Sequence, residues 1–455
     1  MQNEIVISDI EREFIDLYRE NRNMFEAKAS AQVNKVRKSG IRDFERLGIP
    51  GKKNEDYKYT PLQPLFRNGY RKYLEPKKVE FNLAHVFRCD IPTLDTHLVL
   101  IVNGFFDKKN GELLRELPSG IIIGSLAAAS HEYPELFEKH YGKYASHQDG
   151  LVALNSAFAQ DGFFLYVPKG TIYKKFIQIV NLLVAKEDIM VQHRNLIIVD
   201  DNAQAGVIIC DHALTPHSFL TNSVTEIYTA ENTFFDYVKV QNEHNNAVQF
   251  SHIFVNQEAN SNMTSNILTL HGGVVRNNVN VLLNGEGAEN NSYGLYLVDQ
   301  EQHVDNYTFI DHARPNCISN QLYKGVLDDS ATGAFNGRIL VRKDSQKTHA
   351  YQANNNILLT DEAKINSKPQ LEIYADDVKC SHGATVGQLD DEALFYMRSR
   401  GIPEKEARLI MMSAFTHEII SNIKTDPLRT RINELVEKRL RGELSACDNC
   451  AVKCY

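Results

Sequence analysis

The sequence predicts a mainly β protein in which a solenoid of coiled strands, a parallel β-helix, lies between two helical regions. Three observations predict this class: helical periodicity at both ends, alternation of apolar and polar residues through the middle, and turns that recur at a nearly fixed interval. The chain has 455 residues, of which 43% are hydrophobic and 24% charged, so two or three packed units are expected. We divide it into a mostly helical region at 1–160, a β-helix core at 161–385, a helical region at 386–445 and a Cys-rich tail at 446–455.

The first region begins with helix signals. Ser8 and Glu11 have the spacing of a capping box, and the apolar residues that follow lie on one helical face. Gly40 is expected to end a second helical stretch, since glycine is common just beyond a helix C-terminus. A polar, turn-rich connector follows at 50–61. Helical patterns return between about 125 and 160.

The central region has the signature of strands. Apolar and polar residues alternate at 195–199, 224–228, 250–254 and 279–283. Turn-rich segments begin at 200, 230, 257 and 285, which is 27 to 30 residues apart. A supersecondary unit that repeats at this interval favours a solenoid, whose stacked Asn residues can hydrogen-bond along the turns. An antiparallel sandwich is the alternative architecture.

Helices are expected again after residue 388. Asp390 is a good N-cap, Gly401 is a good residue to follow the helix end, and Pro403 suits the first position of a second helix. A third, amphipathic helix is expected at 428–440. Helical regions at both ends would cap the solenoid and protect its open edges.

Composition and missing motifs exclude several functions. The net charge of −8 and the pI of about 6.1 argue against general nucleic-acid binding. The longest apolar stretches are too short to cross a membrane, and the acidic N-terminus lacks the features of a signal peptide, so a cytoplasmic protein is expected. No phosphate-binding loop of the G-x-x-x-x-G-K-[ST] type occurs, so ATP hydrolysis by this chain is not expected.

The first candidate site combines a thiol and an imidazole where the strands give way to helices. Cys380 and His382 are two residues apart, so on an extended strand they face the same side and can bind one metal or sulfur species. Glu372 and Asp376 are candidates to orient the ring. The alternative is a tight turn with a buried thiol and a satisfied histidine. Two ligands are too few for a closed site, so the remaining ligands would come from elsewhere.

The tail and two His–Asp pairs are the other candidates. Cys447, Cys450 and Cys454 include a C-x-x-C spacing that chelates metals, although a frayed tail that binds soft metals adventitiously has the same pattern. The general acid/base candidates are His303 with Asp305, and Asp311 with His312, with Cys210 and Cys317 close to similar pairs. Solvated pairs on a strand face are the alternative interpretation.

Four segments resemble one protein family. They are KCSHGATVGQLDDEALFYMRSRGI at 379–402, LEIYADDV at 371–378, AYQANNNILL at 350–359 and NEDYKYTPL at 54–62. Together they are similar to the SufD pattern of the SufB/SufD family of iron–sulfur cluster assembly proteins, with Tyr57 where the family usually has Trp. The segments lie toward both ends of the chain, so the resemblance covers nearly all of it except the tail.

The resemblance implies a right-handed parallel β-helix with flanking helical domains, acting as a non-catalytic scaffold. It implies docking of the ATPase SufC on the C-terminal helices and pairing with SufB through the β-helix, or a homodimer when the chain is alone. A transient iron–sulfur cluster would be held at the interface with SufB, with His382 and Cys380 as its candidate ligands and no tightly bound cofactor in the isolated chain. The candidate residues of the SufC-docking motif are Gln388, Leu389, Asp390, Leu394, Phe395, Tyr396 and Arg400.

Two alternatives stay open from the sequence. The paralogous SufB role is disfavoured because SufB has a Cys in the turn before this strand, whereas the turn at 360–366 has none. The other alternative is a β-helix carbohydrate-active enzyme similar to polysaccharide lyases, since the fold alone does not determine function.

Overall fold

A computed structural model describes residues 8–51, 54–77, 95–107, 112–145 and 148–443. The helices in these ranges are α1 (Asp9–Lys28), α2 (Ala31–Leu47), the 3-10 helix η1 (Glu55–Tyr57), α3 (Leu62–Phe66), α4 (Leu126–Glu132), α5 (Pro134–His140), α6 (Gly150–Phe158), α7 (Asp391–Ser399), α8 (Glu404–Ile420) and α9 (Asp426–Leu440). The strands that precede the main repeat are β1 (Arg71–Lys72), β2 (Thr96–Val102), β3 (Phe105–Phe106), β4 (Leu114–Glu116), β5 (Ile122–Ser125) and β6 (Phe163–Val167). The capping box at Ser8 and Glu11 is present and begins α1, as predicted.

A β-solenoid of about seven turns forms the centre of the molecule. Its strands are β7 (Ile172–Leu183), β8 (Ile189–Val199), β9 (Gln204–Ala213), β10 (Phe219–Thr229), β11 (Phe234–Asn242), β12 (Ala247–Gln257), β13 (Asn262–His271), β14 (Val274–Leu283), β15 (Glu289–Val298), β16 (His303–His312), β17 (Ile318–Leu327), β18 (Thr332–Val341), β19 (Thr348–Leu358), β20 (Lys364–Ile373) and β21 (Val378–Gly387). Even-numbered strands from β8 to β20 pair in one sheet and odd-numbered strands from β7 to β21 in the other, which we call sheets A and B. All pairs along these two runs are parallel, so the predicted solenoid is confirmed and the antiparallel sandwich is not formed.

The turns between coils are held by a ladder of asparagines. Asn202, Asn232 and Asn260 have φ angles of 56°, 57° and 54°, a left-handed conformation that asparagine tolerates better than most residues. The Asn232 Nδ2 donates to the side-chain Oδ1 of Asn202 over 3.3 Å, and the Asn260 Nδ2 donates to the side-chain Oδ1 of Asn232 over 3.2 Å. The predicted stacking of asparagine along the turns is therefore present.

The space between the two sheets is apolar at one end of the strands and polar at the other. Isoleucine and valine side chains from both sheets form a continuous core that includes Ile197, Ile209 and Val281. Toward the other end lie buried polar and charged groups, such as the Lys239 ammonium, which is 3.2 Å from the Asp211 carboxylate. Such groups are tolerated inside a protein only when they are hydrogen-bonded or paired.

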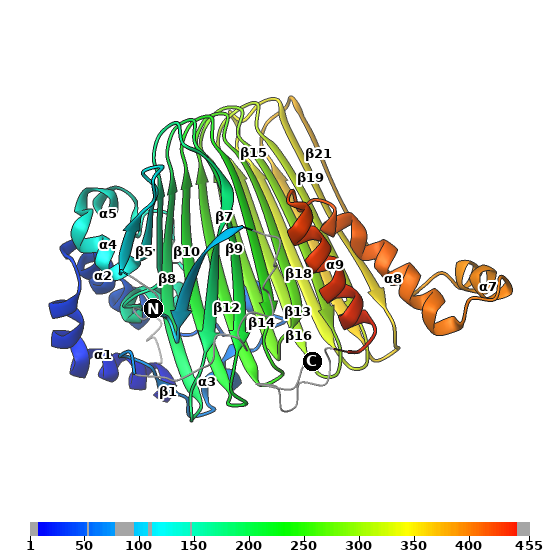
Figure 1. Ribbon diagram of the computed structural model, residues 1–455, viewed down its shortest axis with the longest axis horizontal. Coiled ribbons are helices and arrows are strands. Elements are labelled where there is room, and N and C mark those ends of the chain that lie inside the picture. Colours follow the sequence, from blue (N-terminus) through cyan, green and yellow to red (C-terminus); the bar gives the residue numbers. More distant parts are fainter. Residues whose placement is uncertain (1–7, 52–53, 78–94, 108–111, 146–147, 444–455) are drawn as a thin grey trace, which may run out of the picture.

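Helices cover the outer faces of both sheets (Figure 1). Helices α1, α2 and α6 pack on sheet A through a cluster that contains Phe14, Phe44 and Phe250. Helices α8 and α9 pack on sheet B through a second cluster, in which Ile419 and Leu435 contact strand residues such as Leu268. Helix α7 projects away from both sheets beyond the last coil.

The N-terminal part contributes strands as well as helices. Strand β2 pairs in parallel with β7 and so extends sheet B upstream of residue 161, while β5 pairs with β6 in sheet A. Gly40 does not end a helix: it lies inside α2, where a Cβ atom would come within 2.7 Å of the Ser156 Cβ. Its role is close packing of α2 against α6, which is why the prediction of a helix end at Gly40 was wrong.

The connector at 54–60 fastens the N-terminal region to sheet A. The Tyr57 ring lies 3.9 Å from the Arg276 guanidinium, and its hydroxyl donates to Asp149. Arg276 is paired with Asp305, and both side chains are almost fully buried. Glu55 forms an ion pair with Lys368 of β20 at 2.9 Å, so this segment reaches the last coil.

Candidate functional site

The last coil is the exposed end of the solenoid. Strands β20 and β21 each have a neighbour on one side only, because they end the order of sheets A and B. From Ser381 to Gly387 every residue of β21 is exposed, whereas nearly all residues of the inner strands β12 and β13 are buried. An edge of this kind presents unpaired backbone N–H and C=O groups to a partner strand.

Cys380 and His382 lie together on this coil, on the face that turns toward the space between the sheets. Cys380 is in register with Ala350, packs against the apolar core and is partly buried. Burial raises the pKa of the Cys380 thiol. His382 is in register with Gln352, on the same face, and is exposed because no coil follows it. A thiol and an imidazole therefore lie side by side at the open end of the last coil, which we call the mouth of the solenoid.

The two acidic residues that were expected to orient the imidazole lie elsewhere: one forms an ion pair on β20, and the other is in a turn. Glu372 of β20 is in register with Leu340 of β18, and its carboxylate is 2.7 Å from the Arg338 guanidinium. Asp376 lies in the turn between β20 and β21. The described residues contain no group of three or more His, Cys, Asp or Glu side chains arranged to hold a metal ion. Among the residues that the structure describes, Cys380 and His382 are therefore an incomplete ligand set.

The residue that sequence reasoning missed is Gln352 of β19. It is 3% exposed and lies directly behind His382 in the coil before it. The segment AYQANNNILL contains it, but only the register between β19 and β21 shows which of its side chains faces the imidazole. That register depends on contacts about 30 residues apart.

The predicted acid/base pairs have structural partners. The ring of His303 is within 3.0 Å of the Thr60 hydroxyl and 2.7 Å of the Thr332 hydroxyl, while Asp305 is paired with buried Arg276. Asp311 forms an ion pair with Arg342 at 2.7 Å.

The remaining sulfur and imidazole groups of those candidates are buried. His312 is fully buried, and burial lowers its pKa to about 3. The Cys317 thiol is also buried, with its pKa raised to about 11, and it donates to the Gly285 carbonyl oxygen over 3.3 Å. Cys210 packs into the cluster beneath α8 and α9. These groups hold the solenoid together and are not open to a substrate.

The helix that follows the last coil carries the second candidate surface. Asp390 is the N-cap of α7 and accepts from the backbone N–H groups of Glu392 and Ala393, and Gly401 follows the helix with a φ of 87°, as predicted for both. Pro403 is the N-cap of α8 rather than its first residue, one position earlier than expected.

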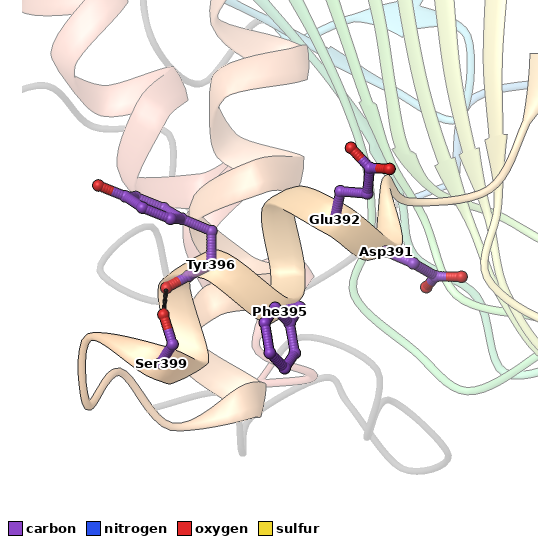
Figure 2. Close-up of a pocket in the computed structure, with 5 residues that line it drawn as sticks. All are labelled: Asp391, Glu392, Phe395, Tyr396 and Ser399. Carbon is purple, nitrogen blue, oxygen red and sulfur yellow. Dashed lines mark hydrogen bonds between the residues drawn. The ribbon is translucent and has the colours of Figure 1, made fainter.

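Two large side chains of α7 are unusually exposed. Phe395 is 73% and Tyr396 is 58% exposed, while Leu394 is buried. Figure 2 shows Phe395 and Tyr396 standing out from the helix. They line an open depression of about 560 Å³ together with Asp391, Glu392 and Ser399. The Arg400 guanidinium lies 5.1 Å from the Tyr396 ring. Exposed aromatic side chains with a polar rim are typical of protein-binding surfaces.

The other members of the predicted docking motif lie at the junction between the solenoid and α7. Gln388 and Leu389 connect β21 to the helix, and Leu389 packs against the cluster beneath α8 and α9. The tail cysteines Cys447, Cys450 and Cys454 lie outside the described residues. None of the helices in the described part of the chain has both the length and the apolar character needed to cross a membrane.

Comparison with known proteins identifies relatives over nearly the whole chain. Residues 182–415 match the SufBD core domain of the SUF system for FeS cluster assembly, and residues 8–179 match the SufBD protein N-terminal region. An iron–sulfur cluster assembly SufBD family protein of Synechocystis is 29% identical over 86% of this chain and 88% of its own length. The iron–sulfur cluster assembly protein SufD of Escherichia coli is 28% identical over 92% of this chain and 96% of its own length. A chloroplastic protein of Arabidopsis thaliana, ABCI7, is 26% identical over 90% of this chain and 86% of its own length.

Proposed function

The chain belongs to the SufBD family of iron–sulfur cluster assembly proteins, and we propose that within this family it works as the SufD-type scaffold subunit. Its similarity to SufD of Escherichia coli extends over both the helical and the solenoid parts. The cluster is then the cargo of the protein and not a resident cofactor. The scaffold holds the cluster transiently and releases it.

The observation that supports this role most directly is the thiol–imidazole pair at the mouth of the solenoid. His382 is exposed and Cys380 lies beside it on the same face, so both can reach a metal that approaches the open end. Imidazole and thiolate are ligands that iron and sulfur species accept. Because two ligands do not close a site, the proposal includes a SufB-type partner that docks along the exposed edge of β21 and supplies the others.

A motor subunit is the second expected partner. We propose that a SufC-type ATPase docks on α7 to α9 through the surface that contains Phe395, Tyr396 and Arg400, with Gln388, Leu389, Asp390 and Leu394 fixing the base of α7. Nucleotide binding by that partner would shift the equilibrium between conformations of the scaffold. This chain contributes no phosphate-binding loop, so the hydrolysis takes place on the partner.

The same edge of β21 is available to a second copy of the chain when no SufB-type partner is present. The location proposed for the complex is the cytoplasm. The net charge of this chain, −8, does not favour nucleic acid as a ligand. No observation favours the carbohydrate-active enzyme, since the buried His–Asp candidates are occupied by structural contacts. The SufB role is disfavoured because the turn at 360–366 lacks a cysteine.

Replacement of His382 tests the proposal. His382→Ala should lower the iron and sulfide content of the co-purified SufB–SufC–SufD-type complex about tenfold or more, because loss of a metal-site contact typically costs at least this much. The control is His349→Ala, which removes a histidine from the outward face of the neighbouring strand. Unchanged iron and sulfide in the intact His382→Ala complex would exclude the proposed role of this side chain.

A further inference from the structure

Gln352 lies in a row of polar side chains, one from each of three successive coils, that ends at His382; we call this row the file. Gln321 of β17, Gln352 of β19 and His382 of β21 are in register on successive coils, and all three occupy positions that face the space between the sheets. Neighbouring strands of a sheet are about 4.8 Å apart, so side chains in such a file contact one another. Gln321 and Gln352 are each 3% exposed, whereas His382 is exposed.

The amide of Gln352 is held at one end and free at the other. Its Nε2 donates to Gln321 Oε1 over 2.5 Å, and the Thr308 hydroxyl donates to the same oxygen over 3.4 Å. A Cβ atom on Gly337 would lie 2.4 Å from Gln352 Nε2, so the amide packs closely against the sheet A backbone at a position without a side chain. Gln352 Oε1 is buried and has no hydrogen-bond partner among the described residues.

Within β19 this free acceptor distinguishes Gln352 from its buried neighbour on the same face. Asn354, two residues along the same strand and also buried, uses both ends of its amide. Its Nδ2 donates to the Tyr296 hydroxyl over 2.9 Å, and its Oδ1 accepts from Ser367 over 2.7 Å and from Asn356 over 2.8 Å. A buried carbonyl oxygen without a donor is uncommon and calls for a partner. The next side chain in the file of Gln352 is the imidazole of His382.

An amide oxygen can only accept a hydrogen bond, and this restricts which tautomer an imidazole beside it can adopt. A neutral histidine has one N–H and one nitrogen with a free lone pair, and which is which depends on the hydrogen bond that the ring makes. An acceptor on the inner side selects the tautomer whose N–H points inward. The outward nitrogen then keeps the lone pair with which histidine binds a metal.

We propose that Gln352 is a positioning residue for His382: when the exposed imidazole turns toward it, the unpartnered Oε1 accepts the inward N–H of the ring. This hydrogen bond fixes the tautomer that presents a metal-binding nitrogen to the outside of the solenoid. The identity of the metal, an iron atom of the nascent cluster, rests on the proposed function. The tautomer itself is a property of this chain alone.

The tautomer can be measured directly in the full-length chain labelled with ¹⁵N-histidine, because the two ring nitrogens have different chemical shifts when protonated and when free. The His382 signals are assigned by their loss in His382→Ala. We expect a single tautomer for His382 in the unsubstituted protein. Gln352→Met has a similar length but no acceptor, and it should change the tautomer ratio at least tenfold toward a mixture.

Two variants separate positioning from general damage. Gln352→Glu keeps an acceptor oxygen, so the inward nitrogen of the imidazole should stay protonated. Gln370→Glu adds the same charge on the other edge strand, β20, in register with Arg338 on the outer face, and should leave the His382 tautomer unchanged.

Two results would overturn the inference: a mixture or the opposite tautomer in the unsubstituted chain, or an unchanged ratio in Gln352→Met. The first result needs no variant to fold. If the ratio changes in Gln352→Met but the iron and sulfide content of the complex does not, the positioning inference stands and the proposed role of His382 in cluster binding fails.

Discussion

The buried carboxyl group of Glu243 predicts a pH dependence of stability that one substitution should remove. Glu243 follows β11 and is 5% exposed, with Oε2 unpartnered among the described residues. Burial, with a smaller contribution from the Asp211 carboxylate, raises its pKa to about 8, while Lys239 and His212 act in the opposite direction. The folded protein therefore holds a proton on Glu243 at pH values where the unfolded chain has lost it.

The sign and size of the effect follow from this difference. In the unfolded chain the pKa of Glu243 is near its ordinary value of 4.5, so between pH 4.5 and about 8 the folded state binds more protons than the unfolded state. The stabilising contribution is complete below pH 4.5 and is lost as the pH rises through 8. At about 1.4 kcal/mol for each pH unit, the loss is about 5 kcal/mol as an upper bound.

Glu243→Gln keeps the shape of the side chain and cannot ionise, so it should be nearly neutral at pH 5 and stabilising at pH 8. The measurement is chemical denaturation followed by far-UV circular dichroism at both pH values. Buried His193, His252 and His271, with pKa values lowered to about 4, change stability in the opposite direction. Because these histidines are present in both proteins, their contributions cancel when the two are compared. The difference in the pH dependence of the free energy of unfolding then reports on Glu243 alone.

Glu231→Gln is the matched control, since it removes a carboxylate from an exposed turn. It should shift the denaturation midpoint equally at both pH values. If the coils unfold in more than one step, the step that includes β11 carries the effect. Equal pH dependence in Glu243→Gln and in the unsubstituted protein would refute a protonated Glu243 in the folded state.

Two further predictions concern the C-terminal part. Replacing both Phe395 and Tyr396 by Ala should weaken binding of the SufC-type partner about tenfold or more, as loss of exposed aromatic anchors usually does, without lowering the thermal midpoint. Calorimetric titration measures the affinity, and Ile172→Ala, which removes an exposed apolar side chain from β7, is the control. Unchanged affinity in the double variant contradicts the prediction. A chain that ends at Glu443 should bind less Zn²⁺ than the full chain, because a C-x-x-C pair with a third thiolate close by chelates zinc. Equal zinc content in the two chains, measured by mass spectrometry after dialysis, contradicts a tail site.

Local signals predicted the element types well. The capping box at Ser8 and the N-cap at Asp390 depend on residues three positions apart or less, and both are present. The asparagine ladder was predictable because the same residue type recurs at the interval of one coil. Gly40 shows the limit, since the sequence does not say whether a glycine ends a helix or lets two helices approach.

The candidate site could be predicted only in part, because the register between coils decides which side chains of a strand point into the space between the sheets. The spacing of Cys380 and His382 predicts that they share one face of the strand, but it does not show that this face turns inward. Gln352 is about 30 residues from its neighbours in the file, and nothing local distinguishes it from Gln346 or Gln370. The cover that α8 and α9 give to sheet B is likewise a long-range contact.

The two edge strands of the last coil differ in a way that favours β21 as the pairing edge. An exposed strand edge is a liability, and proteins protect one with proline and charged side chains. Strand β20 contains Pro369, which has no N–H to donate, together with Lys364 and Lys368, and the latter is held by Glu55. Strand β21 has only Lys379 near its start, and it contains no proline, no Arg and no Asp or Glu. One edge is blocked against an incoming strand while the edge beside His382 is left open, which is the arrangement that a dedicated partner at the thiol–imidazole pair requires.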